Sequence, residues 1–123
     1  MQTTKLRILF VDDNDDIRFM VTLLLGGSNY EVMTTDCVTN ALKLAQQESF
    51  DLYLLDNKFP DGTGKDLCEK IREFDHTTPI IFYSGDSHES DRQRALSCGA
   101  QAYVTKPDID GLPKAIARVM QAA

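Results

Sequence analysis

Residues 50–64 read FDLYLLDNKFPDGTG, and this segment decides the fold of the chain. Within it, residues 52–55 form a short apolar run of the length expected for a strand buried on both faces of a parallel sheet. The run stops at Asp56, and the turn-forming residues 60–64 then predict a cap and a new helix. Asp56 is therefore expected at the carboxyl end of a central strand, the edge of an open α/β sheet at which ligands bind. An aspartate after a strand is also common as a plain turn residue or cap, so the rest of the chain must distinguish the two.

The composition is that of one globular domain spanning residues 1–123, with 42% hydrophobic and 26% charged residues. The net charge is −6 and no basic cluster is present, which argues against direct nucleic-acid binding. No signal peptide and no apolar stretch approaching the ~20 residues of a membrane span is found, so we expect a cytoplasmic protein without membrane contact. Cys37, Cys68 and Cys98 form no CxxC pair and are expected to be buried small hydrophobes in a reducing compartment.

Apolar runs typical of strands alternate with helical patterns five times along the chain. The expected strands are residues 6–11, 30–34, 52–55, 79–83 and 102–105. The expected helices carry apolar side chains at helical spacing, namely Ile17, Met20, Val21, Leu24 and Leu25; Val38, Ala41, Leu42 and Ala45; Leu67, Ile71 and Phe74; Ala95 and Leu96; and Leu112, Ile116, Val119 and Met120. The fourth helix, around residues 90–97, has the fewest apolar residues and should be the least well packed.

Five βα units with short connections predict a three-layer, doubly wound α/β fold, (βα)5, with a parallel five-stranded sheet of the flavodoxin-like order 2-1-3-4-5. In that order, strands one, three, four and five are neighbours, and each of them ends in a polar residue. These residues are Asp12 and Asp13, Asp56, Ser84 and Lys106. The convergence of these side chains on one edge favours a functional role for Asp56.

The chemistry of such a cluster follows from its charge. Two carboxylates about 4 Å apart repel by roughly 4 kcal/mol at an effective dielectric constant near 20, so Asp12, Asp13 and Asp56 need compensation. Mg²⁺, a hard cation that binds carboxylate, water and phosphate oxygens, provides it together with Lys106. Once the metal and Lys106 neutralise the site, the Asp56 carboxylate is able to attack phosphorus and form an aspartyl phosphate, with Ser84 and Lys106 contacting the phosphate oxygens.

Over its whole length the chain resembles the receiver domain of two-component response regulators. The resemblance is carried by Val11-Asp12-Asp13-Asn14 with Arg18, Asp56 with Pro60 and Gly64, Ser84-Gly85, and Tyr103-Val104-Thr105-Lys106-Pro107. It implies phosphorelay signalling, in which Asp56 accepts a phosphoryl group from a sensor histidine kinase or phosphotransfer protein and switches an output face toward a downstream domain or protein. It also implies a monomer or a phosphorylation-dependent dimer, and a domain that catalyses only its own phosphorylation and dephosphorylation.

The resemblance further assigns roles within the site. Asp12, Asp13, Asp56 and the backbone carbonyl of Lys58 would hold Mg²⁺, with Asp12 bound through water. Ser84 and Lys106 would contact the phosphate, Tyr103 would change rotamer together with Ser84, and the Lys106–Pro107 peptide would be cis. For Tyr103, plain half-buried packing is the alternative.

Three positions depart from the family pattern, namely Asn57, Lys58 and Asp108. Lys58 and Asp86 are each two residues past a proposed phosphate ligand, and we expect them either to form an ion pair over the site or to remain solvated. Asp15 and Asp16 are assigned to the first turn of a helix capped by Asn14, rather than to the metal site. The Asp61-Gly62 pair is expected to form a turn, and His76 and His88 are expected in solvent.

Other functions fit the sequence less well. A phosphatase of the aspartyl-phosphate type needs a second acid two residues after its nucleophile, where this chain has Lys58. A flavin protein of the same fold cradles a phosphate in its first loop, which the acidic residues 12–16 would repel. An adaptor that works without phosphorylation would lack Asp56, Lys106 or the acid pair. The sequence leaves open a stand-alone regulator, a phosphorelay intermediate, and a receiver within a larger regulator or hybrid kinase.

Overall fold

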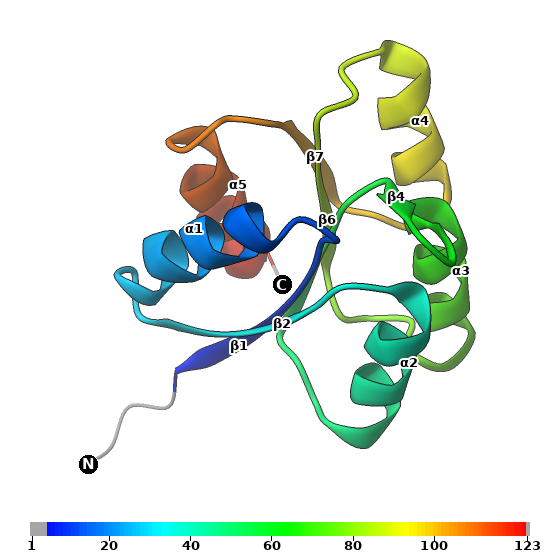
Figure 1. Cartoon of the computed structure of the whole chain (residues 1–123), viewed down its shortest axis with the longest axis horizontal. Helices are drawn as coiled ribbons and strands as arrows, with labels where there is room; N and C mark the ends of the chain where they lie inside the picture. The colour runs from blue at the N-terminus through cyan, green and yellow to red at the C-terminus, as the bar shows by residue number, and fades with distance from the viewer. Residues whose placement is uncertain (1–4, 123) are drawn as a thin grey trace.

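A computed structural model describes residues 5–122, so residues 1–4 and 123 of the expected domain lie outside the described range. Its central sheet is parallel and has the strand order β2-β1-β3-β6-β7, which confirms the predicted order (Figure 1). The strands are β1 (Leu6–Val11), β2 (Tyr30–Thr35), β3 (Leu52–Leu55), β6 (Ile80–Ser84) and β7 (Ala102–Thr105).

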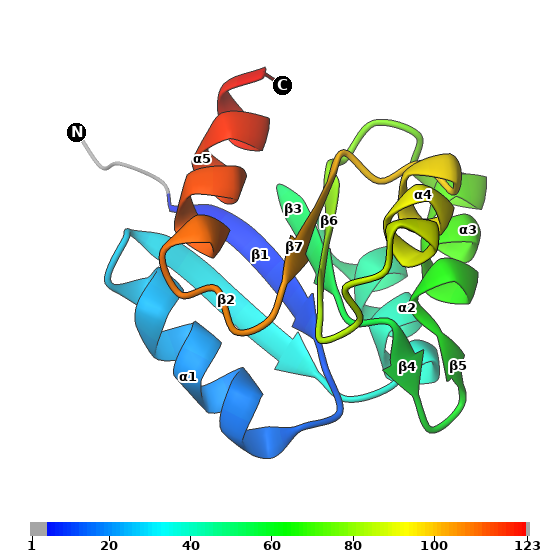
Figure 2. The same cartoon turned by 90° about the horizontal axis from the view of Figure 1, so that it is seen from above.

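Five helices cover the two faces of the sheet and complete the three layers (Figure 2). They are α1 (Asp15–Gly26), α2 (Val38–Gln47), α3 (Gly64–Phe74), α4 (Glu89–Ser97) and α5 (Gly111–Ala122). Helices α1 and α5 pack on one face, and α2, α3 and α4 pack on the other. Alternate residues of β3 enter the two cores: Leu52 and Leu54 face α1 and α5, whereas Tyr53 and Leu55 face the other helices. Strand β3 is therefore buried on both faces, as its apolar run predicts.

A small antiparallel hairpin, β4 (Lys58–Phe59) with β5 (Gly62–Thr63), was not predicted and lies between β3 and α3. Its turn holds Asp61, and Phe59 is buried beneath it. Thr63 caps α3 in a capping box with Asp66, which confirms the predicted cap. The hairpin fixes the path of the chain directly after Asp56.

Three of the apolar residues that mark the expected helices are exposed. Met20, Phe74 and Leu96 are 37%, 41% and 37% exposed, so they lie at the margin of the apolar stripes and not in the core. Helix α4 buries only Ala95, which confirms that it is weakly packed. Of the cysteines only Cys68 is buried, because Cys37 and Cys98 lie at helix ends. Within residues 5–122, no helix has the length and apolar character needed to cross a bilayer.

Candidate functional site

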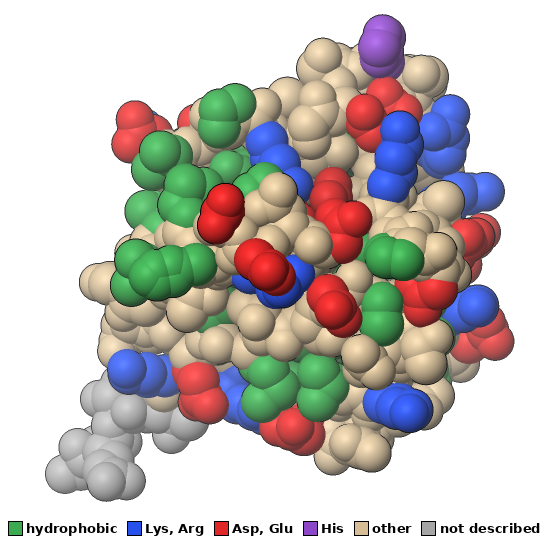
Figure 3. All heavy atoms as spheres, viewed as in Figure 1, with side chains coloured by type: hydrophobic (Ala, Val, Ile, Leu, Met, Phe, Trp, Pro, Cys, Tyr) green, Lys and Arg blue, Asp and Glu red, His purple; other side chains and the backbone are tan. Residues whose placement is uncertain are grey.

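The carboxyl ends of the inner strands bring the predicted polar residues together. Sheet register aligns Val11 with Leu55 and Ser84 with Thr105, so the residues that follow these strands start level with one another. Figure 3 shows acidic side chains gathered near the centre of the face on which β1 ends in Figure 1. The predicted convergence on one edge is therefore confirmed.

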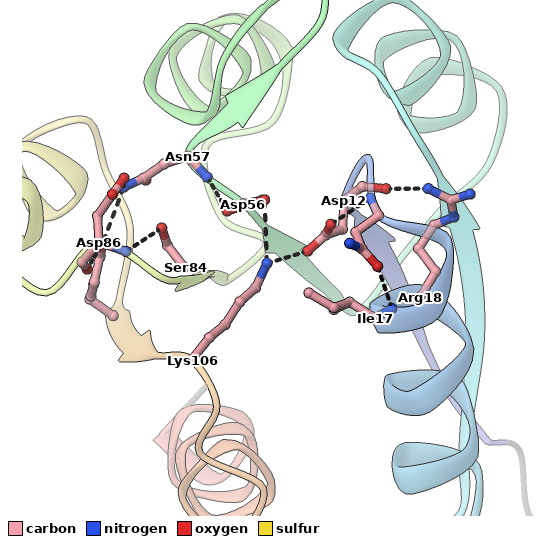
Figure 4. Close-up of polar contacts among 10 residues, drawn as sticks. Asp12, Ile17, Arg18, Asp56, Asn57, Ser84, Asp86 and Lys106 are labelled. Atoms are coloured by element: carbon pink, nitrogen blue, oxygen red, sulfur yellow. Dashed lines mark hydrogen bonds and ion pairs between the residues drawn. The ribbon is translucent and has the colours of Figure 1, made fainter.

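Lys106 lies between two of the carboxylates (Figure 4). Its Nζ is 2.5 Å from Asp12 Oδ2 and 3.3 Å from Asp56 Oδ2. Burial disfavours the charged ammonium, but the hydrogen bond to Asp12 and the charge of Asp56 outweigh it and raise the pKa of Lys106. For Asp56, burial disfavours the charged carboxylate and raises its pKa, although Lys106 and the backbone N–H of Asn57 oppose that change. Because Asp12 is fully buried, Lys106 compensates a charge that water does not reach.

Asp12, Asp13 and Asp56 form a group of three carboxylates, each with one oxygen within 4.8 Å of the others. Lys106 engages one oxygen of Asp12 and one of Asp56, and Asp13 is exposed. The cluster consists of hard oxygen donors on an open edge, which fits Mg²⁺ rather than a soft or thiol-bound metal. Lys58 begins β4 two residues after Asp56, and its side chain is exposed.

The loop before α1 is fixed by its own side chains. The Asn14 side chain accepts the Ile17 N–H at 3.0 Å and caps α1, with Asp15 and Asp16 in the first turn as predicted. The guanidinium of Arg18 donates to the Asp12 backbone carbonyl at 2.6 Å and pairs with Asp15. Asp15 and Asp16 stay outside the group of three carboxylates.

Asn57 connects the residues on the other side of the site through hydrogen bonds, a role that the sequence did not predict. Its Nδ2 donates to Asp86 Oδ2 and to Tyr103 Oη, each at 3.0 Å. Tyr103 Oη donates to the Asp86 carbonyl at 2.7 Å, and the Asp86 N–H donates to Ser84 Oγ at 3.2 Å. We define Asn57, Ser84, Asp86 and Tyr103 as the Asn57 network.

The structure contradicts the first of the two alternatives given for Lys58 and Asp86, the ion pair over the site. The Asp86 carboxylate bonds to Asn57, and no ion pair joins it to Lys58 among the described residues. Lys58 lines the same cavity as Asn57 and Asp86, but Asn57 is the residue that bonds to the Asp86 carboxylate. The departure of Asn57 from the family pattern was the available signal.

Tyr103 is packed as well as hydrogen-bonded. Its ring stacks on Phe82, with centroids 6.1 Å apart and planes at 11°. Burial raises the pKa of its hydroxyl. The Lys106–Pro107 peptide is cis, as predicted. His76 and His88 are exposed, also as predicted.

Gly64 brings the start of α3 against the acceptor strand. A Cβ at this position would overlap the Asp56 carbonyl oxygen and lie 2.6 Å from the Phe82 ring. The Gly64 N–H donates to the Asn57 carbonyl at 2.8 Å. Only glycine permits this approach, which fixes the backbone around Asp56.

Known proteins are similar to this chain in sequence and fold. The sequence model of one protein family, the response regulator receiver domain, matches residues 8–117 of this chain. Regulatory protein VanR of Enterococcus faecium is 39% identical over 101 residues, which make up 82% of this chain and 43% of VanR. The chain thus spans about half the length of the curated relatives it matches.

Solved structures of receiver domains have the same fold as this chain. A CheY-like receiver domain protein of Methanospirillum hungatei has a TM-score of 0.91 and 29% identity, covering 97% of this chain and 96% of that one. Response regulator TrrA of Thermotoga maritima, solved in complex with Mg(2+)-BeF, has a TM-score of 0.85 and 29% identity, covering 93% and 98%. The chain belongs to the family of response regulator receiver domains, which act in phosphorelay signalling through phosphorylation of an aspartate.

Proposed function

We propose that Asp56 of this chain accepts a phosphoryl group from the phosphohistidine of a sensor histidine kinase or phosphotransfer protein. The observation that carries this proposal is the position of Lys106 Nζ, 2.5 Å from Asp12 and 3.3 Å from Asp56 at the carboxyl edge of the sheet. A partly buried cation between two carboxylates lowers their repulsion and is able to hold an incoming phosphate oxygen.

In the transfer, a carboxylate oxygen of Asp56 forms a bond to phosphorus as the phosphorus–nitrogen bond of the donor breaks, and the imidazole leaves with the electron pair. The Asp56 side chain is 15% exposed, so a donor reaches it from solvent. The Asn57 N–H holds Asp56 Oδ1 at 2.7 Å and orients the carboxylate. Lys106 and the Ser84 hydroxyl contact the phosphate oxygens.

Asp12, Asp13, Asp56 and the backbone carbonyl of Lys58 would hold Mg²⁺, which when bound neutralises charge between the phosphate and the acids. This chain supplies the oxygen donors for it at one edge of the sheet. Turnover of an external phosphate ester is not expected, because Lys58 occupies the position of the second acid. The domain would catalyse only its own phosphorylation and dephosphorylation.

The signal would pass through the Asn57 network. When Ser84 Oγ turns to a phosphate oxygen, it gives up its bond with the Asp86 N–H, and Tyr103 responds because its hydroxyl is bonded to the Asp86 carbonyl. Helix α4 begins just after this loop and is weakly packed, so it is free to move. A downstream domain or protein in the cytoplasm would read this change, with the receiver as a monomer or a phosphorylation-dependent dimer.

The test is phosphorylation with acetyl phosphate and Mg²⁺, followed by intact mass measurement. We expect one added phosphate in the wild type and none in Asp56→Asn. Asp16→Asn is the matched control, since it removes an exposed carboxylate outside the site and should be labelled like the wild type. Equal labelling of Asp56→Asn would contradict the assignment.

A further inference from the structure

Two cysteines from different helices meet beneath α4. Cys68 is on α3 and fully buried, and Cys98 is the residue at which α4 ends. The Cys68 thiol donates to the Cys98 backbone carbonyl at 3.2 Å, and the Cys98 thiol donates to the Ala95 carbonyl at 3.0 Å. The two side chains are thus neighbours across the α3–α4 contact, 30 residues apart in the chain.

A second residue of α3 holds this contact in place. One helical turn after Cys68, Arg72 donates to the Gly99 carbonyl from Nη2 at 2.8 Å and from Nε at 3.3 Å. It also donates to the Thr78 carbonyl at 2.8 Å. Because Gly99 follows Cys98 directly, these bonds fix the end of α4 against α3.

The two thiols have unequal environments. Cys98 is partly exposed, and its interaction with the Cys68 thiol lowers its pKa. The same interaction, together with burial, raises the pKa of Cys68. The thiolate is the nucleophilic form, so Cys98 is the sulfur that an oxidant in solution reaches and that reacts first. Cys68 lies behind it as a second thiol.

We propose that Cys98 and Cys68 form a reversible disulfide when the protein meets a peroxide. The Cys98 thiolate attacks one peroxide oxygen, the oxygen–oxygen bond breaks, and a sulfenic acid and hydroxide result; the hydroxide takes up the proton that the thiol released and leaves as one water. The Cys68 sulfur then attacks the Cys98 sulfur and displaces its hydroxyl as a second water. Two thiols lose two electrons and two protons, and one hydrogen peroxide becomes two waters. A dithiol reductant reverses the change.

The bond would tie the end of α4 to α3. Beyond the Arg72 bonds at its end, helix α4 buries only Ala95, so the cross-link would add a covalent restraint to a weakly packed helix. The expected readout is slower amide hydrogen exchange in α4 after oxidation. This inference stands on the cysteine contact and does not rest on phosphotransfer to Asp56.

The test uses the full chain and hydrogen peroxide. Trypsin places the three cysteines in separate peptides, residues 19–43, 66–70 and 95–114. Under non-reducing conditions we expect the second and third peptides to become linked, with the mass of two hydrogens lost, and to separate on reduction. Cys37→Ser is the matched control and should form the link like the wild type.

Cys98→Ser should abolish the link. Cys68→Ser and, in case a buried hydroxyl disturbs folding, Cys68→Ala should instead leave Cys98 as a sulfenic acid that dimedone traps. A peroxide-treated wild type that carries oxidised Cys98 without the link would overturn the proposal, and so would a link through Cys37 or between two chains.

Discussion

The Asn57 side chain donates a hydrogen bond to the Asp86 carboxylate at 3.0 Å, next to the proposed phosphoacceptor. The same amide bonds to Tyr103, whose hydroxyl bonds back to the Asp86 carbonyl. One side chain thus joins the residue after Asp56 to the loop after β6 and to β7. The loop and the tyrosine are therefore restrained together in this structure.

Asn57→Ala should release both partners. We expect a loss of about 1 kcal/mol in unfolding free energy, the usual value of such a hydrogen bond, and broader NMR signals from the Tyr103 ring. In a cycle with Tyr103→Phe, the two losses should not add, because both variants remove the same bond. Lys58→Ala is the control and should leave Tyr103 unchanged, since its side chain is exposed. Equal effects of Asn57→Ala and Lys58→Ala would contradict this role of Asn57.

The proposed Mg²⁺ site makes a second prediction. At free Mg²⁺ ten times its dissociation constant, binding should stabilise the fold by about 1.4 kcal/mol and raise the Tm by roughly 3 to 6 °C. Asp13→Asn removes one of three clustered carboxylates, so it should stabilise the metal-free protein and weaken the response. Asp16→Asn should respond like the wild type. A wild-type melting curve that is indifferent to Mg²⁺ would refute the site.

Gly64 provides a third prediction. A methyl group there overlaps the Asp56 carbonyl oxygen and crowds the Phe82 ring, so Gly64→Ala should cost about 1–3 kcal/mol and slow phosphorylation by acetyl phosphate. Gly26→Ala is the control, since its methyl group meets nothing within 4 Å and alanine favours a helix. Thermal melts and phosphorylation rates measure both effects. Wild-type stability and rate in Gly64→Ala would show that the close approach does not matter.

The sequence was sufficient for the sheet and for the polar residues at its edge, because buried strands appear as apolar runs and each inner strand ends in a polar residue. It did not predict the β4–β5 hairpin, whose strands of two residues leave no periodic pattern. It was also insufficient for the bonds of Asn57, because its partners Asp86 and Tyr103 lie 29 and 46 residues away and leave no local pattern. The hydrogen bonds of Asp61 were not predicted for the same reason. The sequence predicts only a turn at Asp61, whereas its hydrogen-bond partners Thr39 and Val38 lie 22 and 23 residues away.

The hydrogen bonds of Asp61 predict that the stability of the fold depends on pH. The Asp61 carboxylate accepts the Val38 N–H at 2.8 Å and the Thr39 N–H at 2.9 Å, and so caps α2, whose own N-cap residue Cys37 makes no side-chain cap bond. The backbone bonds from Thr39 and Val38 hold the pKa of Asp61 below its ordinary value of 3.8. A depressed pKa in the folded state gives stability that is present above the unfolded pKa and is lost as pH falls through the folded pKa.

Asp61→Asn should therefore melt below the wild type at pH 7, with a difference that shrinks as the solution is acidified below about pH 4. Asp36→Asn, near the same helix end, should show neither effect, and a Tm difference for Asp61→Asn that persists unchanged at low pH would exclude the charged cap.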